Sequence, residues 1–469
     1  MDDKKQQLAA IVGVDGVSDT PEALESYASD RSCVPRIPPR YIVHPKNAAH
    51  VQALVRWANG TATPLIPVSS GPPHSNGDTV PSVAEAVIVD LRLMKAILKI
   101  DRRNRIVVIE PGVTYAELEP ALAEHGLRIT RPLLPRSNKS VIAGLLERQP
   151  TTIPRLNYSL PEPLRVCGVV WGTGDVSFTG EAGMGPLSLE AQWKAGMAQV
   201  NQQGPFSTDL MRLLTGAQGT MGIVIWASIR CQLLPAAKKR FVVSAASIED
   251  LVEFCRKVER LRLGDEALLL NNVRLGAAMN RPAGDLPNWS VLLGAAGAAL
   301  YPHEKLDLQE KELYGIATEF GLKLHIAETQ AAALLDGFSQ PAPRYDVFFL
   351  STLDAVPGFV ESVFGLAREV GYGTDRVGVY VQPQHQGVSQ HVEFSIPYDA
   401  ADSKDAAAAE RLFVAASEKL VAQGAYFSRP YGLWADLVYS RDATATRVLR
   451  TVKQIVDPNR VMNPGKLCF

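Results

Sequence analysis

Cysteine is scarce in this chain and is not arranged for a disulfide framework or a metal site. The 469 residues include five cysteines, and no two of them stand in CxxC spacing. An odd, scattered set does not suggest disulfide pairing, and neither zinc nor iron–sulfur ligation has a signature here. The sequence therefore predicts no resident metal and a protein of a reducing compartment, for which we expect the cytoplasm.

A long hydrophobic run and an excess of charge of one sign are missing as well. The most apolar stretch, residues 291–301, is much shorter than the about 20 residues that cross a bilayer, and residues 1–5 are too charged for a secretory leader. Lys plus Arg total 48 against 49 Asp plus Glu, so no basic field attracts nucleic acid or anionic lipid. We expect a soluble protein with a small-molecule substrate, no nucleic acid partner and no membrane contact.

Common catalytic and nucleotide-binding motifs are also absent. No Walker A sequence, HExxH or GxSxG is found, and Gly172-Thr173-Gly174 falls in a stretch typical of a hairpin rather than between a strand and a helix. His385 and His391 are close in sequence, but no carboxylate pair completes a metal site. These absences disfavour NAD in a Rossmann unit.

The residues that are present describe a packed protein of more than one domain. Apolar residues make up 46% of a chain that is long enough for two large units or three smaller ones. Strands and helices follow one another in mixed order in the first half, which predicts an α+β domain. We expect strands at 41–43, 63–68, 86–90, 105–110 and 165–171, a helix at 45–59 closed by Gly60, and a helix that starts with a Thr114–Glu117 capping box and ends at Gly126.

A second unit begins where the composition shifts, at about residues 235–239. Alternating strands and amphipathic helices there suggest a sheet covered on one face. We expect helices at 248–262, 302–320 and 356–370, strands at 348–351 and 391–397, and a final helix at 403–423 that leads into a tail from 426 to 469.

Two Gly-rich segments are candidates for ligand binding. The loop of residues 69–78 is rich in Ser, Gly and Pro, so its backbone N–H groups can converge on an anion such as a pyrophosphate. By itself this loop slightly favours a surface loop with turn chemistry. The turn around Gly219 and Gly222, which suits positive φ or a close backbone approach, favours the ligand-binding interpretation.

Four sequence blocks resemble a known family. They are PVSSG at 67–71, VVIEPGVT at 107–114, GAQGTMGI at 216–223 and DPNRVMNPGK at 457–466. In this order they resemble FAD-linked oxidases of the vanillyl-alcohol oxidase and 4-cresol dehydrogenase type. The resemblance implies an α+β fold: a two-lobed PCMH-type FAD-binding domain (1–238), an α+β cap domain with an antiparallel sheet (239–423), and a C-terminal return to the first domain (424–469).

The resemblance also implies which residues hold FAD. The main-chain N–H groups of the loop at 69–75 would bind the pyrophosphate, and the stretch at 140–148 would run along the flavin. The backbone of the Gly-rich turn at 219–223 would approach the cofactor, and the closing motif would lie beside the flavin. The residues concerned are Pro67, Ser69, Ser70, Gly71, His74 and Ser75; Ser140, Gly144, Glu147 and Arg148; Gly219, Gly222 and Ile223; and Asn463 and Lys466. His391 is the candidate for a covalent bond to the flavin, with His74 as the alternative and a plain strand histidine as the other interpretation.

Departures from the family pattern bear on the substrate. The family's phenol-binding tyrosines fall on Asn76, Thr152 and Ser428 here, and its acidic residue falls near Pro135. Arg429 alone is kept, as the predicted ligand of an anionic or polarised oxygen, and Tyr426 or Tyr431 could substitute for a missing tyrosine. A 4-alkylphenol substrate is therefore in doubt.

The sequence leaves several functions open. An FAD-dependent oxidase or dehydrogenase would take a hydride from a small alcohol or aromatic-type substrate to flavin N5 and pass the electrons to oxygen or a partner protein. The alternatives are a redox-inactive binding or assembly subunit, and a 2-hydroxy-acid dehydrogenase, although the histidine motif of that group is absent from residues 382–387. The sequence determines neither an electron-acceptor protein nor a homo-oligomer.

Overall fold

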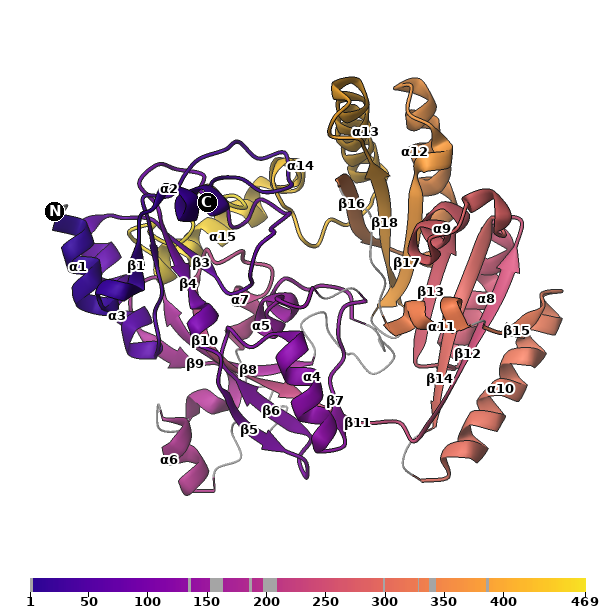
Figure 1. Ribbon diagram of the computed structural model, residues 1–469, viewed down its shortest axis with the longest axis horizontal. Helices are drawn as coiled ribbons and strands as arrows, with labels where there is room; N and C mark the ends of the chain where they lie inside the picture. Colours follow the sequence, from indigo (N-terminus) through magenta and orange to yellow (C-terminus); the bar gives the residue numbers. More distant parts are fainter. Residues whose placement is uncertain are drawn as a thin grey trace.

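The computed structural model describes residues 3–133, 136–151, 163–184, 188–196, 209–297, 300–327, 329–336, 343–384 and 388–469. Figure 1 shows two bodies side by side: the N-terminal half and the C-terminal segment form one, and the middle of the chain forms the other. The chain passes into the second body after β11 (Gln232–Leu233), which pairs with β7 (Leu127–Arg128).

The first lobe is a small sheet with helices on both faces. Its strands β2, β3 and β4 are parallel, and alternate residues of each strand pack against different helices. Continuous burial of β2 and β4 agrees with a parallel sheet that is covered on both sides. The elements are α1 (Asp3–Val12), β1 (Val17–Ser18), α2 (Pro21–Ala28), β2 (Tyr41–Val43), α3 (Ala48–Thr61), β3 (Leu65–Val68) and β4 (Val87–Asp90).

The second lobe is an antiparallel sheet in the order β5-β6-β10-β8-β9. Thr114 and Glu117 form the predicted capping box at the start of α4. Its elements are β5 (Ile97–Asp101), β6 (Ile106–Ile109), α4 (Tyr115–Glu124), α5 (Val141–Leu146), β8 (Leu164–Trp171), β9 (Val176–Phe178), α6 (Leu189–Lys194), α7 (Met211–Leu214) and β10 (Gly222–Arg230).

The second body is the cap, built on a sheet that has the order β15-β12-β14-β13-β17-β18-β16 in the described residues. All its strand pairs are antiparallel. Its elements are β12 (Ala237–Ala245), α8 (Glu249–Arg260), β13 (Glu266–Asn271), α9 (Asn272–Met279), β14 (Trp289–Gly297), α10 (Pro302–Glu319), β15 (Leu324–Ile326), α11 (Thr329–Ala333), β16 (Arg344–Ser351), α12 (Val356–Glu369), β17 (Gly378–Gln384), β18 (Ser389–Pro397) and α13 (Ser403–Ala422).

Helices cover both faces of the cap sheet, so the expectation of one covered face is wrong. The larger core packs α8, α10, α12 and α13 against one face, while α9 and the segment of α11 pack against β13 and β14 on the other. The rest of that second face, on β16, β17 and β18, carries polar side chains. Apolar periodicity could not reveal α9 because its buried face includes Arg274 and Gly276.

The C-terminal segment returns to the first body, but not as a plain tail. The expectation that the helix at 403–423 is the last one is wrong, because α14 (Leu433–Tyr439) and α15 (Ala443–Val456) follow it. Asp442 caps α15 through Thr444 and Ala445, a signal that the sequence does contain. The cap core still includes the side chains of Ala425, Phe427, Tyr431 and Trp434. Met462 forms a parallel β-bridge with Leu65 in the first lobe. The division at residue 424 stays a prediction.

The remaining predicted elements agree with the structure to within a few residues at their ends. One helix end differs: α3 continues through Gly60 to Thr61, and Ala62 takes the left-handed conformation instead. No helix among the described residues has the length and apolar character needed to cross a membrane.

A buried ion pair holds the returning segment in place. Lys453 Nζ donates to Thr220 O, Met462 O and the Asp457 carboxylate, and that carboxylate accepts from the N–H groups of Val461 and Met462. Both side chains are almost fully buried. The pair therefore joins the Gly-rich turn before β10 to the closing motif.

We expect Lys453→Met to lower the free energy of unfolding by about 3–5 kcal/mol, because it leaves the Asp457 carboxylate buried and unpaired. Urea denaturation measures the change. Lys419→Met, on the exposed side of α13, is the control and should have little effect. Equal stability of the two variants would contradict a role for the pair.

Candidate functional site

A cleft between the two lobes, the inter-lobe cleft, lies where the resembling blocks meet. It is bounded by β3 and its loop, by α5 and by the turn that leads into β10. The residues that line it are Pro67, Ser69, Asp78, Leu91, Pro111, Ile142, Ala143, Leu146, Glu147, Leu214, Gly216, Ala217, Gln218, Gly219, Met221, Gly222, Ile223, Val224 and Tyr431. The sequence blocks at 67–71, 107–114 and 216–223 all contribute to it.

The loop of residues 69–77 carries unused backbone donors. Gly71 N donates to Asn138 O at 3.0 Å and Gly77 N donates to the Asp30 carboxylate at 2.6 Å. Within the described residues, the N–H groups of Ser69, Ser70, His74, Ser75 and Asn76 have no acceptor. Of these residues only Ser69 lines the inter-lobe cleft, where its free N–H is available to an anion.

Contacts from neighbouring segments fix the shape of this loop. Ser70 Oγ accepts a hydrogen bond from Ser140 N at 3.1 Å, and Ser140 in turn caps α5 through Ala143 N. A Cβ on Gly71 would come within 2.6 Å of the Asn138 side chain. Ser70, Gly71 and Ser140 therefore hold the wall of the cleft, and Gly144 packs against Tyr115 rather than lining it.

The Gly-rich turn forms the opposite wall. Gly219 has φ +71° and lies against Pro67, where a Cβ would approach Pro67 Cγ to 2.5 Å. Arg148, at the end of α5, donates to Thr215 O at 2.8 Å and to its hydroxyl at 3.2 Å. Gly219 thus satisfies the predicted need for positive φ, whereas Gly222 begins β10 and has close backbone neighbours instead.

The closing motif ties the loop and the turn together. Asn463 Nδ2 donates to Asp78 O at 3.0 Å and to Gln218 O at 2.7 Å, while its Oδ1 is buried without a partner. Lys466 Nζ donates to Gly77 O at 2.7 Å. Asn463 and Lys466 thus hold the loop and the turn from behind. The lining of the cleft itself offers the free N–H of Ser69 and the unobstructed backbone of Gly216 and Gly219, so the residues present fit FAD.

Two carboxylates add negative character to this region. Glu147 lines the cleft and pairs with Lys139, which is itself buried. Burial and the nearby Glu147 raise the pKa of Asp78 to about 7, against the opposing charges of Lys139 and Lys466. Asp78 is therefore partly protonated near neutral pH, which limits its repulsion of a bound phosphate.

Arg429 is the most unusual charged residue on the cap side. It is 8% exposed, and its guanidinium carbon lies 4.0 Å from the centre of the Phe348 ring. In the part of the chain that the structure describes, its side chain has neither an ion pair nor a hydrogen bond. Burial lowers its pKa, and the surrounding Tyr431, Glu147, Glu393 and Tyr380 partly oppose that effect. A buried cation without a partner is costly unless a ligand supplies the anion.

The two tyrosines beside Arg429 differ sharply. Tyr431 is buried and lines both the inter-lobe cleft and a second cavity, so it stands between them. Tyr426 is 56% exposed, and its backbone pairs with Leu350 at the edge of the cap sheet. Of the two, only Tyr431 lies where a substrate tyrosine is expected.

His391 belongs to a hydrogen-bonded row on the polar face of the cap sheet. Its Nε2 lies 3.3 Å from Glu393 Oε2, and Arg274 Nη2 donates to Glu393 Oε1 at 2.6 Å. Burial raises the pKa of Glu393, but the charge of Arg274 and the bond to His391 prevail and bring it to about 2. Burial lowers the pKa of His391. A neutral His391 that donates from Nε2 to an ionised Glu393 leaves Nδ1 as its free acceptor.

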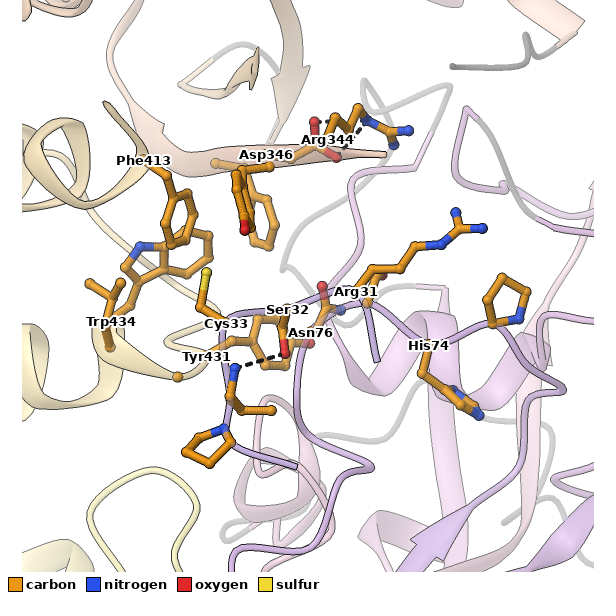
Figure 2. Close-up of a pocket in the computed structure, with 18 of the residues that line it drawn as sticks. Arg31, Ser32, Cys33, His74, Asn76, Arg344, Asp346, Phe413, Tyr431 and Trp434 are labelled. Atoms are coloured by element: carbon orange, nitrogen blue, oxygen red, sulfur yellow. Dashed lines mark hydrogen bonds and ion pairs between the residues drawn. The ribbon is translucent and has the colours of Figure 1, made fainter. Parts of the chain in front are cut away.

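The second cavity, the cap cavity, has a volume of about 370 Å³. It lies between the N-terminal loop at 31–35, the loop at 73–76, β16, α13 and the segment at 431–434. Figure 2 shows Phe413 and Trp434 on one side of it, with Arg31 and His74 on the other. His74 and Ser75 line this cavity and not the inter-lobe cleft.

The structure thus separates the predicted site residues into groups. Of the predicted cofactor-binding residues, six line the inter-lobe cleft, seven hold its walls from behind, two line the cap cavity, and His391 lies in the cap sheet; of the predicted catalytic residues, Tyr431 lines both spaces. The roles assigned to all of them remain predictions, and Pro135, Thr152 and His385 lie outside the described residues. The sequence analysis missed Glu393, although it stands two residues after His391 on a strand and so shares its face. It also missed Arg31, Arg136 and Trp434, which carry no motif.

Comparisons with known proteins support the cofactor assignment. Residues 39–147 match the family model described as FAD binding domain. Over 98% of both chains, the protein is 24% identical to D-2-hydroxyglutarate dehydrogenase of Stutzerimonas stutzeri. It is 23% identical to the 4-cresol dehydrogenase flavoprotein subunit of Pseudomonas putida, over 98% of this chain and 94% of that protein.

Solved structures give the same fold. The 4-ethylphenol oxidase of Gulosibacter chungangensis superposes with a TM-score of 0.83 at 18% identity, over 98% of this chain and 96% of the other. The p-cresol methylhydroxylase structure gives 0.82 at 17% identity, over 99% and 96%. The predicted α+β PCMH-type fold and the FAD cofactor are confirmed, and residues 39–147 are an FAD binding domain.

We expect Gly219→Ala to lose FAD, because the new Cβ meets Pro67 and the backbone has positive φ. The flavin absorbance per protein in the purified variant measures the loss. Gly365→Ala, in α12 with open space around it, should keep its flavin. Full flavin content in Gly219→Ala would show that the turn does not shape the cofactor site.

The lowered pKa of His74 predicts that the free energy of unfolding depends on pH. Burial and the charges of Arg136 and Lys139 lower the pKa of His74 to about 4. Below the unfolded value of about 6.5 the unfolded chain binds a proton that the folded chain does not, so stability falls as the pH falls. His74→Phe, which keeps an aromatic ring beside Tyr27, should reduce by roughly 2 kcal/mol the stability lost between pH 7 and pH 4. Urea unfolding at both pH values tests this, and identical losses in the two proteins would contradict it.

Proposed function

We propose that this FAD-dependent oxidoreductase oxidises a small organic substrate that carries an anionic oxygen, with Arg429 as the residue that binds that oxygen. The single observation that carries the proposal is the buried guanidinium of Arg429, which has no acceptor among the described residues; Arg429 stands two residues before Tyr431, which lines the inter-lobe cleft. The chemistry that FAD supplies when bound is acceptance of a hydride at N5, with later transfer of the electrons to oxygen or to a partner protein.

Arg429 would bind the substrate in a place from which water is largely excluded. Phe348 covers one face of the guanidinium, and Phe348 itself packs edge-on against Trp434 at 4.8 Å. In such a site a charge-assisted hydrogen bond is stronger than in water. The same bond holds the substrate in one orientation, so that it faces the cleft on the side of Tyr431.

His391 is the proposed proton acceptor. Its Nε2 is held toward Glu393, which Arg274 keeps ionised, so Nδ1 is the basic atom that remains available. A neutral imidazole held by a carboxylate can take up a proton from a substrate hydroxyl. The alternative role for His391, covalent attachment of the flavin, stays a prediction.

A second candidate is the oxidation of a 2-hydroxy acid. It is favoured by the likeness to D-2-hydroxyglutarate dehydrogenase over almost the whole of both chains. The carboxylate of such a substrate would also suit Arg429. Both candidate functions are oxidations that reduce the flavin, whereas a redox-inactive binding subunit would not reduce it.

We expect Arg429→Ala to slow substrate-dependent flavin reduction by about 10²–10³-fold while FAD remains bound, because it removes a charged contact in a dry site. Anaerobic bleaching of the flavin absorbance, against a panel of alcohols, phenols and hydroxy acids, measures the rate. Arg429→Lys should keep part of the rate, and Arg368→Ala on the exposed side of α12 is the control. Equal loss of flavin and of rate in Arg429→Ala would assign Arg429 a structural role. A wild-type flavin that no compound reduces would favour the redox-inactive alternative.

A further inference from the structure

The cap cavity has an aromatic half whose rings are fixed before any ligand binds. Phe348 and Trp434 meet edge to face at 4.8 Å, Phe413 lies 5.8 Å from Trp434, and Tyr345 lies 5.3 Å from Phe413. Trp434 Nε1 donates to Ser417 Oγ at 2.8 Å, which fixes the indole. A preformed wall of this kind binds a flat apolar group at little cost in side-chain entropy.

The other half of the cavity is cationic. Arg31, Arg136 and Arg344 line it, and Arg344 is neutralised by Asp346 at 2.9 Å. Among the described residues, Arg31 and Arg136 have no carboxylate within 4 Å, and Arg136 Nη1 is buried without a hydrogen-bond partner. Burial lowers the pKa of Arg136, the charge of Glu147 opposes this, the like charge of Arg31 lowers the pKa, and Asp78 raises it.

The carboxylates near these two arginines have other partners. Asp30 accepts hydrogen bonds from Ser32 N and Gly77 N, and Glu147 pairs with Lys139. The two guanidinium groups repel each other, and an anionic ligand between them would relieve that repulsion and give Arg136 Nη1 an acceptor.

We propose that the cap cavity binds an aromatic carboxylic acid, with the ring against Phe413 and Trp434 and the carboxylate between Arg31 and Arg136. The volume of about 370 Å³ falls within the range of small-molecule sites. An uncharged aromatic compound would leave the two arginines unpaired. A small acid such as lactate would leave the aromatic wall in contact with water.

The inference goes beyond the proposed function. Tyr431 lines both the cap cavity and the inter-lobe cleft, so a ligand of this cavity lies beside that cleft, whereas Arg429, the proposed ligand of the substrate oxygen, does not line the cavity. The binding chemistry of the cavity stands apart from turnover. Binding and flavin reduction therefore test the two proposals separately.

The test is equilibrium binding to the oxidised holoprotein, by calorimetry and by quenching of tryptophan fluorescence. The probes are 3-phenylpropanoate, the uncharged 3-phenylpropan-1-ol, and lactate. We expect the aromatic acid to bind about tenfold or more tightly than either other probe, because only it uses both halves of the cavity. Arg31→Gln and Arg136→Gln should each weaken it by about tenfold, and Phe413→Ala should weaken it as well.

Arg103→Gln, in the exposed turn between β5 and β6, is the matched control and should bind as the unaltered protein does. Arg31 is exposed, so its variant folds even if Arg136→Gln does not, and Arg136→Lys is the conservative substitute. Equal affinity for the acid and the alcohol would overturn the proposal, as would unchanged affinity in the Arg31 variant.

Discussion

The geometry of the inter-lobe cleft depends on the buried ion pair between Lys453 and Asp457. The inter-lobe cleft is assembled from segments that are hundreds of residues apart, and this pair is where the last of them is attached. Lys453 binds carbonyl groups of both the Gly-rich turn and the closing motif, and Asp457 satisfies two backbone N–H groups of that motif. Every hydrogen-bonding direction of the ammonium is used, which is the condition under which a buried charge is tolerated.

The cap supplies the other half of the site by a different principle. Alternation along β18 places His391, Glu393 and Ser395 on one face and Val392, Phe394 and Ile396 in the core on the other. The same face receives Arg274 from α9, which donates to both Glu393 and Ser395. The sheet is thus an apolar support on one side and a polar surface on the side toward the FAD binding domain.

Much of the fold could be predicted from local signals, because the capping box, the Gly-rich turns and the amphipathic helices each depend on residues that are close together in the sequence. The resemblance of four blocks correctly indicated the FAD binding domain, since the Gly and Pro residues in them are required by close packing, as at Gly219 against Pro67. The arginines of the cap cavity could not be found in this way. Arg31, Arg136 and Arg344 come from three distant loops and strands, and only the tertiary structure brings their charges together. Helix α15 was missed although Asp442 marks its start; the residues that it buries, Thr446 and Lys453, are polar and gave no apolar pattern.

Tyr431 is a wall common to the inter-lobe cleft and the cap cavity. A side chain in that position cannot shift toward one compartment without enlarging the other. If a ligand in one space moves this ring, then the affinity in the other space changes, and the change is the same factor in both directions.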